Sequence, residues 1–279
     1  MSRFFVIRKK AVNRLAQALC LLALLAAVIP LAAILIDALG RGGAALNWAF
    51  FTALPKPVGE SGGGMVNAIA GSAILVVLAS IVGLPFGIFS GIYLAEFGDH
   101  RLGHVIRFLA DVLSGIPSIV VGIFAYALLV LPFRHFSALA GGFALGLMMI
   151  PTITRTTEEL ILRVPTTLRE GALALGIPYW KMVLRVVLRA VRGGILTGIL
   201  LSIARIMGET APLLFTAFGN RFWSIRLFDP IAALPLQIFS YALSPFDDWH
   251  RQAWAGALVL IAFVLGLNLT SRLVIRMYR

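Results

Sequence analysis

Long uninterrupted stretches of apolar residues constrain the fold of this chain more than any other feature. A hydrocarbon core about 30 Å thick is crossed by a helix of roughly 20 apolar residues. Six stretches meet or approach that length, at Leu15–Leu39, Asn67–Phe97, Phe108–Pro132, Ser137–Ile153, Gly193–Phe218 and Gln252–Ile275. Only 13% of the residues are charged, against about 25% in soluble domains. We therefore predict an all-α integral membrane protein with six transmembrane helices.

The lysines and arginines are distributed unevenly around these spans. If the chain begins in the cytoplasm, 17 of the 24 basic residues lie on cytoplasmic segments, six lie on external loops, and Arg205 lies inside a span. The positive-inside rule then predicts that both termini are cytoplasmic. A net charge of +12 would suggest nucleic-acid binding in a soluble protein. Here topology accounts for the charge, and we expect no nucleic-acid partner.

The spans divide the chain into segments. We predict a cytoplasmic segment at 1–14, a first transmembrane helix at 15–39, an external loop at 40–66, a five-helix core at 67–275 with a cytoplasmic loop at 155–192, and a cytoplasmic tail at 276–279. Basic residues before an apolar run resemble a signal peptide, but this run is longer than the roughly 7–15 residues of an h-region. We therefore expect an uncleaved first span. Its single cysteine, Cys20, should face lipid or a neighbouring helix.

The second stretch is rich in small residues. It contains Gly83, Gly87 and Gly91, and small residues let helix backbones approach closely within a membrane. Pro85 lies in the same stretch and should kink the helix. We expect this span to pack tightly against a neighbour.

The third stretch is interrupted by Ser114-Gly115-Ile116-Pro117-Ser118. The residue before a proline disfavours the helical conformation, so we predict a break here. Broken helices at membrane depth are tolerated only where they face protein or a water-filled cavity. The break around Ser114 and Pro117 is therefore either a packing irregularity or part of a gate. Just before it, Arg107 and Asp111 have the i, i+4 spacing of a helical ion pair.

No pattern typical of catalysis or cofactor binding is present. His100 and His104 have helical spacing but no evident third ligand, and we expect hydrated histidines. The run Gly62–Gly64 lacks the Gly-Lys-Ser/Thr of a P-loop and reads as a flexible linker. We predict a non-enzymatic chain without a metal or cofactor. If transport is driven by ATP, the nucleotide must bind another polypeptide.

The loop at 155–192 is too long and too regular to be a bare connector. An apolar helix face is indicated by the i, i+4, i+7 spacing of Leu168, Ala172 and Leu175. Pro165 precedes this helix, and Gly176 with Pro178 turns the chain into a second helix from about Tyr179. The resulting hairpin either docks on a partner or packs on its own membrane domain.

A charged pair lies within the fifth stretch. Arg205 and Glu209 are four residues apart, one turn of a helix. A charge at the centre of a membrane helix costs about 2.5–3.5 kcal/mol on translocon scales, so such residues are usually functional. The alternative is a mutual ion pair that only locks the helix to a neighbour. Pro212 should distort the helix and expose polar groups, including the Thr210 hydroxyl.

The loop resembles the EAA loop of bacterial ABC-importer permeases. That motif ideally reads Glu-Ala-Ala-x3-Gly-x9-Ile-x-Leu-Pro. This chain has Glu170-Gly171-Ala172, then Gly176 after three residues, and Val186-Val187-Leu188 after nine more. Gly171 replaces an alanine. Arg189 replaces the final proline, so the second helix should continue smoothly into the fifth span.

Longer segments resemble the phosphate-specific permeases of the PstA family. They are ADVLSGIPSIVVGIF (Ala110–Phe124), RTTEELILRVPTTLREGALALGIPYWKM (Arg155–Met182) and ILTGILLSIARIMGETAPLLFTA (Ile195–Ala217). NAIAGSAILV from Asn67, GLPFGIFSGIYLAEFG from Gly83 and SPFDDWHRQAWAGALVL from Ser244 match the same family. The match covers essentially residues 60–275 in order.

This resemblance implies a type I ABC importer permease fold in the bacterial inner membrane, with the loop at 40–66 in the periplasm. It implies a permease subunit that moves inorganic phosphate into the cytoplasm by alternating access. The implied partners are a PstC-like sister permease, a PstB-like ATPase dimer and a PstS-like periplasmic phosphate-binding protein. ATP and Mg²⁺ would be bound by the ATPase.

The resemblance also suggests roles for individual residues. Contact with the ATPase would involve Glu170, Gly171, Ala172 and Gly176. The substrate pathway would include Arg205, Glu209 and Thr210, with Arg205 offering its guanidinium to phosphate. Glu209 would hold Arg205 when phosphate is absent, and beside phosphate it must be salt-bridged or protonated. Ser114, Pro117 and Pro212 are candidates for a gate or a helix break.

Two alternative functions fit the sequence less well. A permease for another oxyanion, such as sulfate or molybdate, would share the coupling loop but should lack the run GETAPLLFTA. A stand-alone channel or ion-driven transporter would need no docking loop and would usually show two inverted halves. No convincing internal repeat is present.

Overall fold

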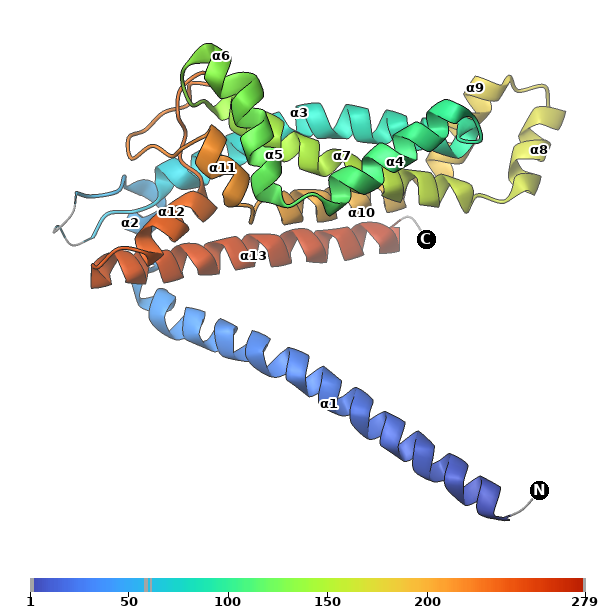
Figure 1. Cartoon of the computed structure of the whole chain (residues 1–279), viewed down its shortest axis with the longest axis horizontal. Coiled ribbons are helices and arrows are strands. Elements are labelled where there is room, and N and C mark those ends of the chain that lie inside the picture. Colours follow the sequence, from blue (N-terminus) through green and yellow to red (C-terminus); the bar gives the residue numbers. More distant parts are fainter. Residues whose placement is uncertain (1–2, 58–59, 61, 278–279) are drawn as a thin grey trace.

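The computed structural model describes residues 3–57, 60 and 62–277, and these residues form an all-helical structure (Figure 1). The elements are α1 Arg3–Gly42, η1 Gly43–Ala45, α2 Trp48–Thr52, α3 Val66–Phe97, α4 Arg101–Gly115, α5 Ser118–Ala125, η2 Tyr126–Val130, α6 Leu131–Phe133, α7 Ala138–Leu162, α8 Thr166–Ala174, α9 Tyr179–Met182, η3 Val183–Val187, α10 Leu188–Ile206, α11 Ala211–Thr216, α12 Leu234–Ala242 and α13 Asp247–Met277. The predicted all-α class is confirmed.

Within the described part of the chain, five helices are long and apolar enough to cross a membrane. They are Val12–Ala45, Val66–Phe97, Ala138–Leu162, Tyr179–Ile206 and Asp247–Leu273. A sixth span is possible if the bent pair Arg101–Gly115 and Ser118–Phe133 is counted as one. The six predicted stretches thus correspond to five single helices and one bent pair.

The helix α1 begins at Arg3 instead of Leu15, and three other predicted spans are broken or end at a different residue. The third stretch is not one helix, because α4 and the segment Ser118–Phe133 meet at 107° around Ile116 and Pro117. The fourth helix runs to Leu162 instead of Ile153, since polar residues at the end of a span continue the helix beyond the apolar segment. The fifth helix ends at Ile206 instead of Phe218, where Gly208 and the approach to Pro212 interrupt it.

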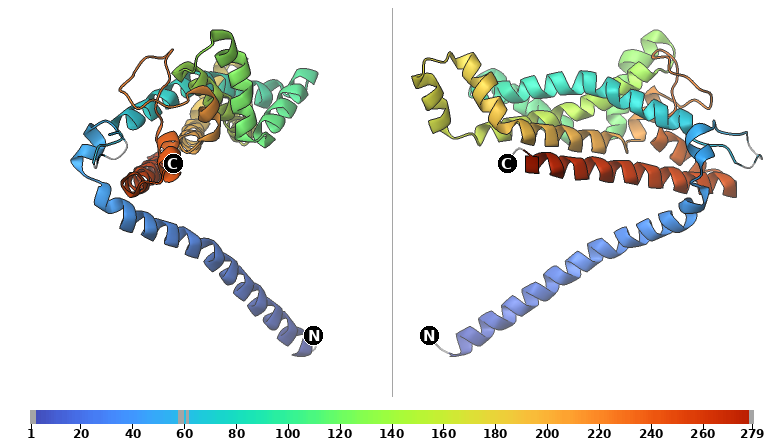
Figure 2. Two further views of the ribbon diagram at one scale, coloured as in Figure 1. Left: turned by 60° about the vertical axis from the view of Figure 1, so that its left-hand side comes forward. Right: turned by 180° about the vertical axis from the view of Figure 1, so that it is seen from behind.

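The long helices α3, α7, α10 and α13 lie along the long axis of the molecule (Figures 1 and 2). One end of this bundle carries α8 and α9, and we call it the α8 end. The opposite end carries α2, α6 and the loops around α12, and we call it the α2 end. The first turn of α1 and the last turn of α13 both lie toward the α8 end.

The helices α3 and α7 run in the same direction and are in close contact. Glycine makes this contact possible, because a Cβ at Gly83 would lie 2.7 Å from the Cβ of Met149. A Cβ at Gly91 would lie 2.5 Å from the Cβ of Thr157. The close packing predicted for the second span is confirmed, and α3 continues through Pro85.

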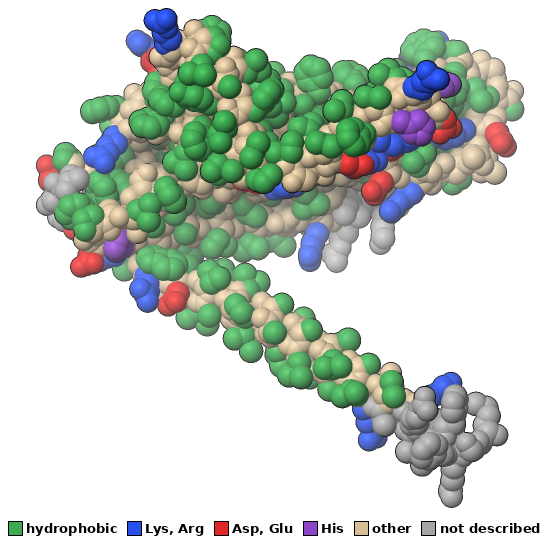
Figure 3. Space-filling view, in the orientation of Figure 1, with side chains coloured by type: hydrophobic (Ala, Val, Ile, Leu, Met, Phe, Trp, Pro, Cys, Tyr) green, Lys and Arg blue, Asp and Glu red, His purple; other side chains and the backbone are tan. Residues whose placement is uncertain are grey.

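The helix α1 leaves the bundle and touches it only near its C-terminal end (Figure 2). There Gly42 packs against the backbone of Trp254, and the Arg41 guanidinium lies 5.7 Å from the centre of the Trp254 ring. Between Val12 and Leu39, α1 exposes many apolar side chains (Figure 3). Cys20 is also exposed. A long apolar helix with so little contact needs lipid or another chain around it.

At the α2 end, the loop before α12 is tied to the start of α3. The Asn67 side chain donates a hydrogen bond to the carbonyl of Asn220 (2.7 Å), and the backbone N–H of Leu234 donates one to Ser72 Oγ (2.8 Å). The supposed linker at Gly62–Gly64 is also anchored, since Gln252 donates to the Gly62 carbonyl (2.6 Å) and Gly64 is buried.

A cavity of about 260 Å³ opens beside this loop. Its polar lining includes Arg221, Gln237 and Tyr241. Burial raises the pKa of the Tyr241 phenol, while the hydrogen bond from Gln237 and the charge of Arg221 act in the opposite direction. The guanidinium of Arg221 is already stacked 5.1 Å from the centre of the Trp249 ring.

Candidate coupling hairpin and transport pathway

The hairpin of α8 and α9 is built by local sequence signals. Pro165 precedes α8, and α8 ends in a Schellman motif with Gly176 in the left-handed region at φ +75°. The N–H of Gly176 donates to the carbonyl of Leu173, and the N–H of Ile177 donates to that of Ala172. The predicted turn at Gly176 and the second helix from Tyr179 are confirmed.

The second helix continues without interruption from α9 through the π-helical turn η3 into α10, as one helix over Tyr179–Ile206. Arg189 lies within it, where proline would have removed a backbone donor. The predicted smooth continuation is confirmed.

The predicted coupling residues divide between two faces of α8. Ala172 is buried against the chain's own helices, in a cluster with Ile161 and Met182. Glu170, Gly171 and Gly176 are exposed. The apolar side chains of Leu168, Leu173, Leu175 and Trp180 are exposed as well, and Leu175 is 82% exposed. The helix face predicted from Leu168, Ala172 and Leu175 therefore packs on this chain only at Ala172, which leaves an apolar surface free at the α8 end.

Arg169, next to Glu170, turns toward the bundle. Its Nη1 donates to both carboxylate oxygens of Glu96 at 2.7 and 2.8 Å, and its Nη2 donates to the carbonyl of Ile161 at 3.1 Å. The Tyr179 hydroxyl donates to the same carboxylate. The side chain of Glu96 is 1% exposed. The end of α3, the end of α7 and both helices of the hairpin thus meet at one buried carboxylate.

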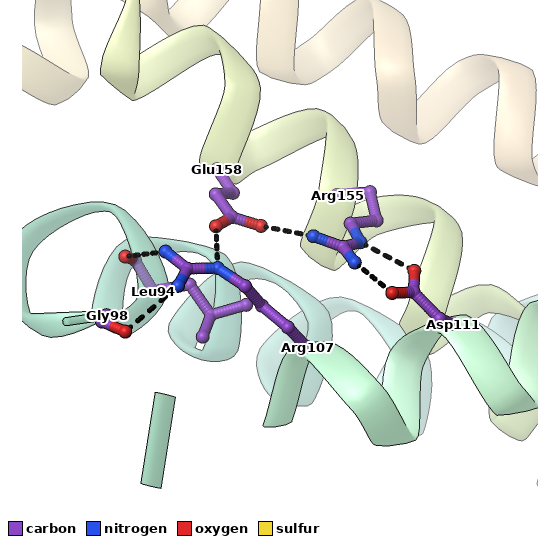
Figure 4. Close-up of polar contacts among 6 residues, drawn as sticks. All are labelled: Leu94, Gly98, Arg107, Asp111, Arg155 and Glu158. Atoms are coloured by element: carbon purple, nitrogen blue, oxygen red, sulfur yellow. Dashed lines mark hydrogen bonds and ion pairs between the residues drawn. The ribbon is translucent and has the colours of Figure 1, made fainter. Parts of the chain in front are cut away.

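A second charged cluster joins α4 to α7 (Figure 4). Glu158, whose side chain is 5% exposed, accepts from Arg107 Nε at 2.7 Å and from Arg155 Nη1 at 3.1 Å. Arg155 also donates from Nε and Nη2 to the two oxygens of Asp111. The predicted ion pair between Arg107 and Asp111 is wrong, because each side chain reaches α7 instead of its neighbour on α4.

Arg107 also closes the C-terminal end of α3. Its Nη1 donates to the carbonyl of Gly98 (2.9 Å) and its Nη2 to that of Leu94 (3.2 Å). These carbonyls have no partner within α3, and a cation there complements the helix dipole. A Cβ at Gly98 would lie 2.3 Å from Arg107 Nη2, so glycine leaves the space for this contact. His100 and His104 lie nearby and are exposed.

The two predicted helix breaks meet in space. The helix α5 begins at Ser118 directly after Pro117, and α11 begins at Ala211 with Pro212 in its first turn. A Cβ at Gly122 would lie 2.6 Å from Pro212 Cα, so the backbones of α5 and α11 touch. Ser114 is exposed at the end of α4, and its hydroxyl donates to the carbonyl of Asp111. The sequence located both breaks but not their contact.

Arg205, Glu209 and Thr210 lie at the second break. They do not share one helix, because α10 ends at Ile206 and the chain turns through hydrogen bonds from Gly208 to Arg205 and from Glu209 to Ile206. Among the described residues, neither the Arg205 guanidinium nor the Glu209 carboxylate has an ion-pair partner. Arg205 is exposed, and Glu209 and Thr210 are partly exposed, on the surface of this chain. The mutual ion pair is thus not formed here, and both charges are available to other groups.

The buried glutamates Glu96 and Glu158 were not identified from the sequence. Arg169 and Arg107, which bind Glu96 and Glu158, lie 73 and 51 residues away in the sequence, beyond any helical spacing. Arg155 lies three residues before Glu158, and this helical spacing is a signal for that one pair. For the other two pairs the only signal is a carboxylate at the end of an apolar span, because a buried carboxylate requires a cation.

Comparison with known proteins agrees with the resemblance. Residues 83–278 match the family of binding-protein-dependent transport system inner membrane components. The chain is 48% identical over 263 residues to the phosphate transport system permease protein PstA of Yersinia pestis, covering 94% of this chain and 89% of that protein. The chain belongs to the PstA family of phosphate transport system permeases. It is also 44% identical over 266 residues to PstA of Haemophilus influenzae, with 95% and 94% covered.

The solved structures give the fold. An inward-facing conformation of the MetNI methionine ABC transporter matches with a TM-score of 0.60 and 16% identity, covering 77% of this chain and 94% of that chain. At this identity the match supports the fold alone. Together with the spans, it confirms a multi-pass membrane protein with the type I ABC importer permease fold.

Proposed function

We propose that this chain is the membrane permease subunit of an ATP-driven importer that moves inorganic phosphate into the cytoplasm. The observation that carries the proposal is its 48% identity to a phosphate transport system permease over 94% of its length. The PstA relatives of Yersinia pestis and Haemophilus influenzae are both named for phosphate transport, which favours phosphate over sulfate or molybdate.

The α8 end supplies the surface that such a subunit needs toward an ATPase. It exposes Glu170 together with the apolar side chains of Leu173, Leu175 and Trp180. Three exposed apolar side chains and a carboxylate on one protruding hairpin fit a docking surface, because removing apolar side chains from water is favourable. We place a PstB-like ATPase dimer here, with ATP and Mg²⁺ on that dimer. This chain itself would then catalyse no reaction.

This assignment implies an orientation of the chain in the membrane. With the α8 end in the cytoplasm, both termini lie there as well, in agreement with the distribution of basic residues. The membrane is the bacterial inner membrane. The α2 end faces the periplasm and a PstS-like phosphate-binding protein, and a PstC-like sister permease completes the pathway.

The pathway passes the two helix breaks. Arg205 binds the phosphate oxygens through its guanidinium fork, because its own chain provides no carboxylate partner among the described residues. Glu209 and Thr210 lie beside it on the turn. The contact between α5 and α11, with Ser114 and Pro117 before one helix and Pro212 in the other, is the gate whose opening gives alternating access.

The test is reconstitution in proteoliposomes with and without the candidate partners. Phosphate uptake and phosphate-stimulated ATP hydrolysis are expected only when the sister permease, the ATPase and the binding protein are all present. Sulfate and molybdate serve as competing anions. Phosphate flux by this chain alone, or equal uptake of sulfate by the full assembly, would contradict the proposal.

A further inference from the structure

The two sides of the α8–α9 hairpin are attached to the bundle in different ways. Along the chain, α8 follows α7 after residues 163–165, and α9 continues into α10. The connection from α8 to α10 includes the turn at Gly176 and the π-helical turn Val183–Val187. Through space, it is attached to α3 and α7 by the side chain of Arg169. The three contacts of this guanidinium are 2.7, 2.8 and 3.1 Å long.

The burial of these groups makes the spatial attachment firm. Glu96 is 1% exposed and Arg169 is 18% exposed, so water does not compete effectively for either charge. The guanidinium of Arg169 is also held at two of its nitrogens, Nη1 by the carboxylate and Nη2 by the Ile161 carbonyl, and this fixes its orientation. Beneath the pair, Ala172 and Val183 of the hairpin pack with Ile92 and Ala95 of α3.

The helices α3 and α7 then act as one body. Gly91 lets their backbones approach near this end. Glu158 on α7 holds Arg107 of α4, and Arg155 on α7 holds Asp111 of α4, so α4 moves with them. The helix α4 leads directly to the break at Ile116 and Pro117, beyond which α5 touches α11.

We propose that Arg169 and Glu96 are positioning residues for transport: their ion pair transmits the movement of α8 to α3, α7 and α4, and so to the break in front of α5. The Tyr179 hydroxyl supports the pair by donating to the same carboxylate. This inference rests on the proposed function, because it assumes that an ATPase moves α8.

The experiment measures phosphate uptake and ATP hydrolysis on the same proteoliposomes containing the full transporter. Glu96→Gln and Arg169→Gln each remove one charge of the pair. Glu159→Gln and Arg163→Gln are matched controls, because both side chains are exposed near the same end of α7. A double variant, Glu96→Arg with Arg169→Glu, exchanges the two charges.

The expected result is that ATP hydrolysis persists in the single variants while the phosphate transported per ATP hydrolysed falls about tenfold, which corresponds to about 1.4 kcal/mol. The exchanged pair should recover part of the ratio, and the controls should match the unmodified chain. An unchanged ratio in the assembled single variants would overturn the proposal.

A third variant tests the proposal even if Glu96→Gln and Arg169→Gln fail to assemble. Tyr179→Phe keeps both charges and removes only the hydroxyl that donates to Glu96, so it should assemble and lower the ratio by a smaller factor. An unchanged ratio in that variant also counts against the proposal. If the unmodified transporter shows no phosphate uptake, the proposed function fails first, and the two failures are thereby distinguished.

Discussion

Two regions of this chain differ in the burial and the pairing of their charged side chains. At the α8 end, Glu96 and Glu158 are almost completely buried, and each is bound by at least one arginine. At the break between α10 and α11, Arg205 and Glu209 lie on the surface of the chain, and among the described residues neither has an ion-pair partner.

The difference shows which charged side chains the fold itself must pair. A buried carboxylate is tolerated only with a cation and further hydrogen bonds, so Glu96 and Glu158 must find theirs within the chain. Arg205 is exposed in this chain and needs no such partner to fold. In the assembled transporter, a sister subunit or phosphate can bind Arg205. We therefore expect loss of a buried carboxylate in the first region to lower the stability of the fold, in addition to the loss of coupling proposed for Glu96 and Arg169. Mutations in the second region should affect transport alone.

The largest effect is expected at the buried cluster. Glu158→Ala leaves the two arginines that it binds without their buried partner, and breaking a buried ion pair costs about 3–5 kcal/mol. Thermal unfolding of the purified chain in detergent should show a clear loss of stability. Glu159→Ala, one residue along and exposed, is the matched control. Equal stability of the two variants would mean that the cluster does not stabilise the fold.

The next largest effect is expected on phosphate transport, from a mutation at the break between α10 and α11. Arg205→Ala should leave the assembled transporter intact but lower phosphate uptake roughly 10- to 100-fold, the value of a charge-assisted hydrogen bond of about 1.5–3 kcal/mol. Uptake and the amount of assembled complex are measured together. Arg101→Ala, an exposed arginine at the α8 end, is the control. A normal rate of phosphate uptake in Arg205→Ala would show that Arg205 is not part of the phosphate pathway.

The smallest effect should sharpen the comparison by testing uncharged packing at the α8 end. Gly91→Ala places a Cβ 2.5 Å from the Cβ of Thr157, and such overpacking costs about 1–3 kcal/mol. Thermal unfolding should register this loss. Gly266→Ala on α13 meets nothing within 4 Å and should be neutral or slightly stabilising. A neutral Gly91→Ala would mean that α3 and α7 can separate without cost.

Much of the fold could be predicted because the signals are local. Apolar length predicted the spans, and α3 begins one residue before the predicted stretch and ends with it, at Phe97. Gly176 predicted the turn of the coupling hairpin, because only a residue tolerant of positive φ suits that position. Pro117 and Pro212 each indicated a break, although the extent of the break before Pro212 was underestimated.

The candidate site was predicted less completely, because its contacts join distant segments. The i, i+4 rule paired Arg107 with Asp111 and suggested a pair of Arg205 with Glu209, and neither pair is formed. In the first case α7 offers Glu158 and Arg155 to α4. In the second case the helix ends after Ile206, so the two side chains are no longer one turn apart.

The sequence by itself determined that this chain crosses a membrane, where its helices lie and which loop protrudes, since hydrophobic length and backbone preference act over a few residues at a time. Only the tertiary structure decided which charges are neutralised and which helices the hairpin holds. Those outcomes depend on side chains such as Glu96 and Arg169, which lie 73 residues apart and meet only when the helices pack.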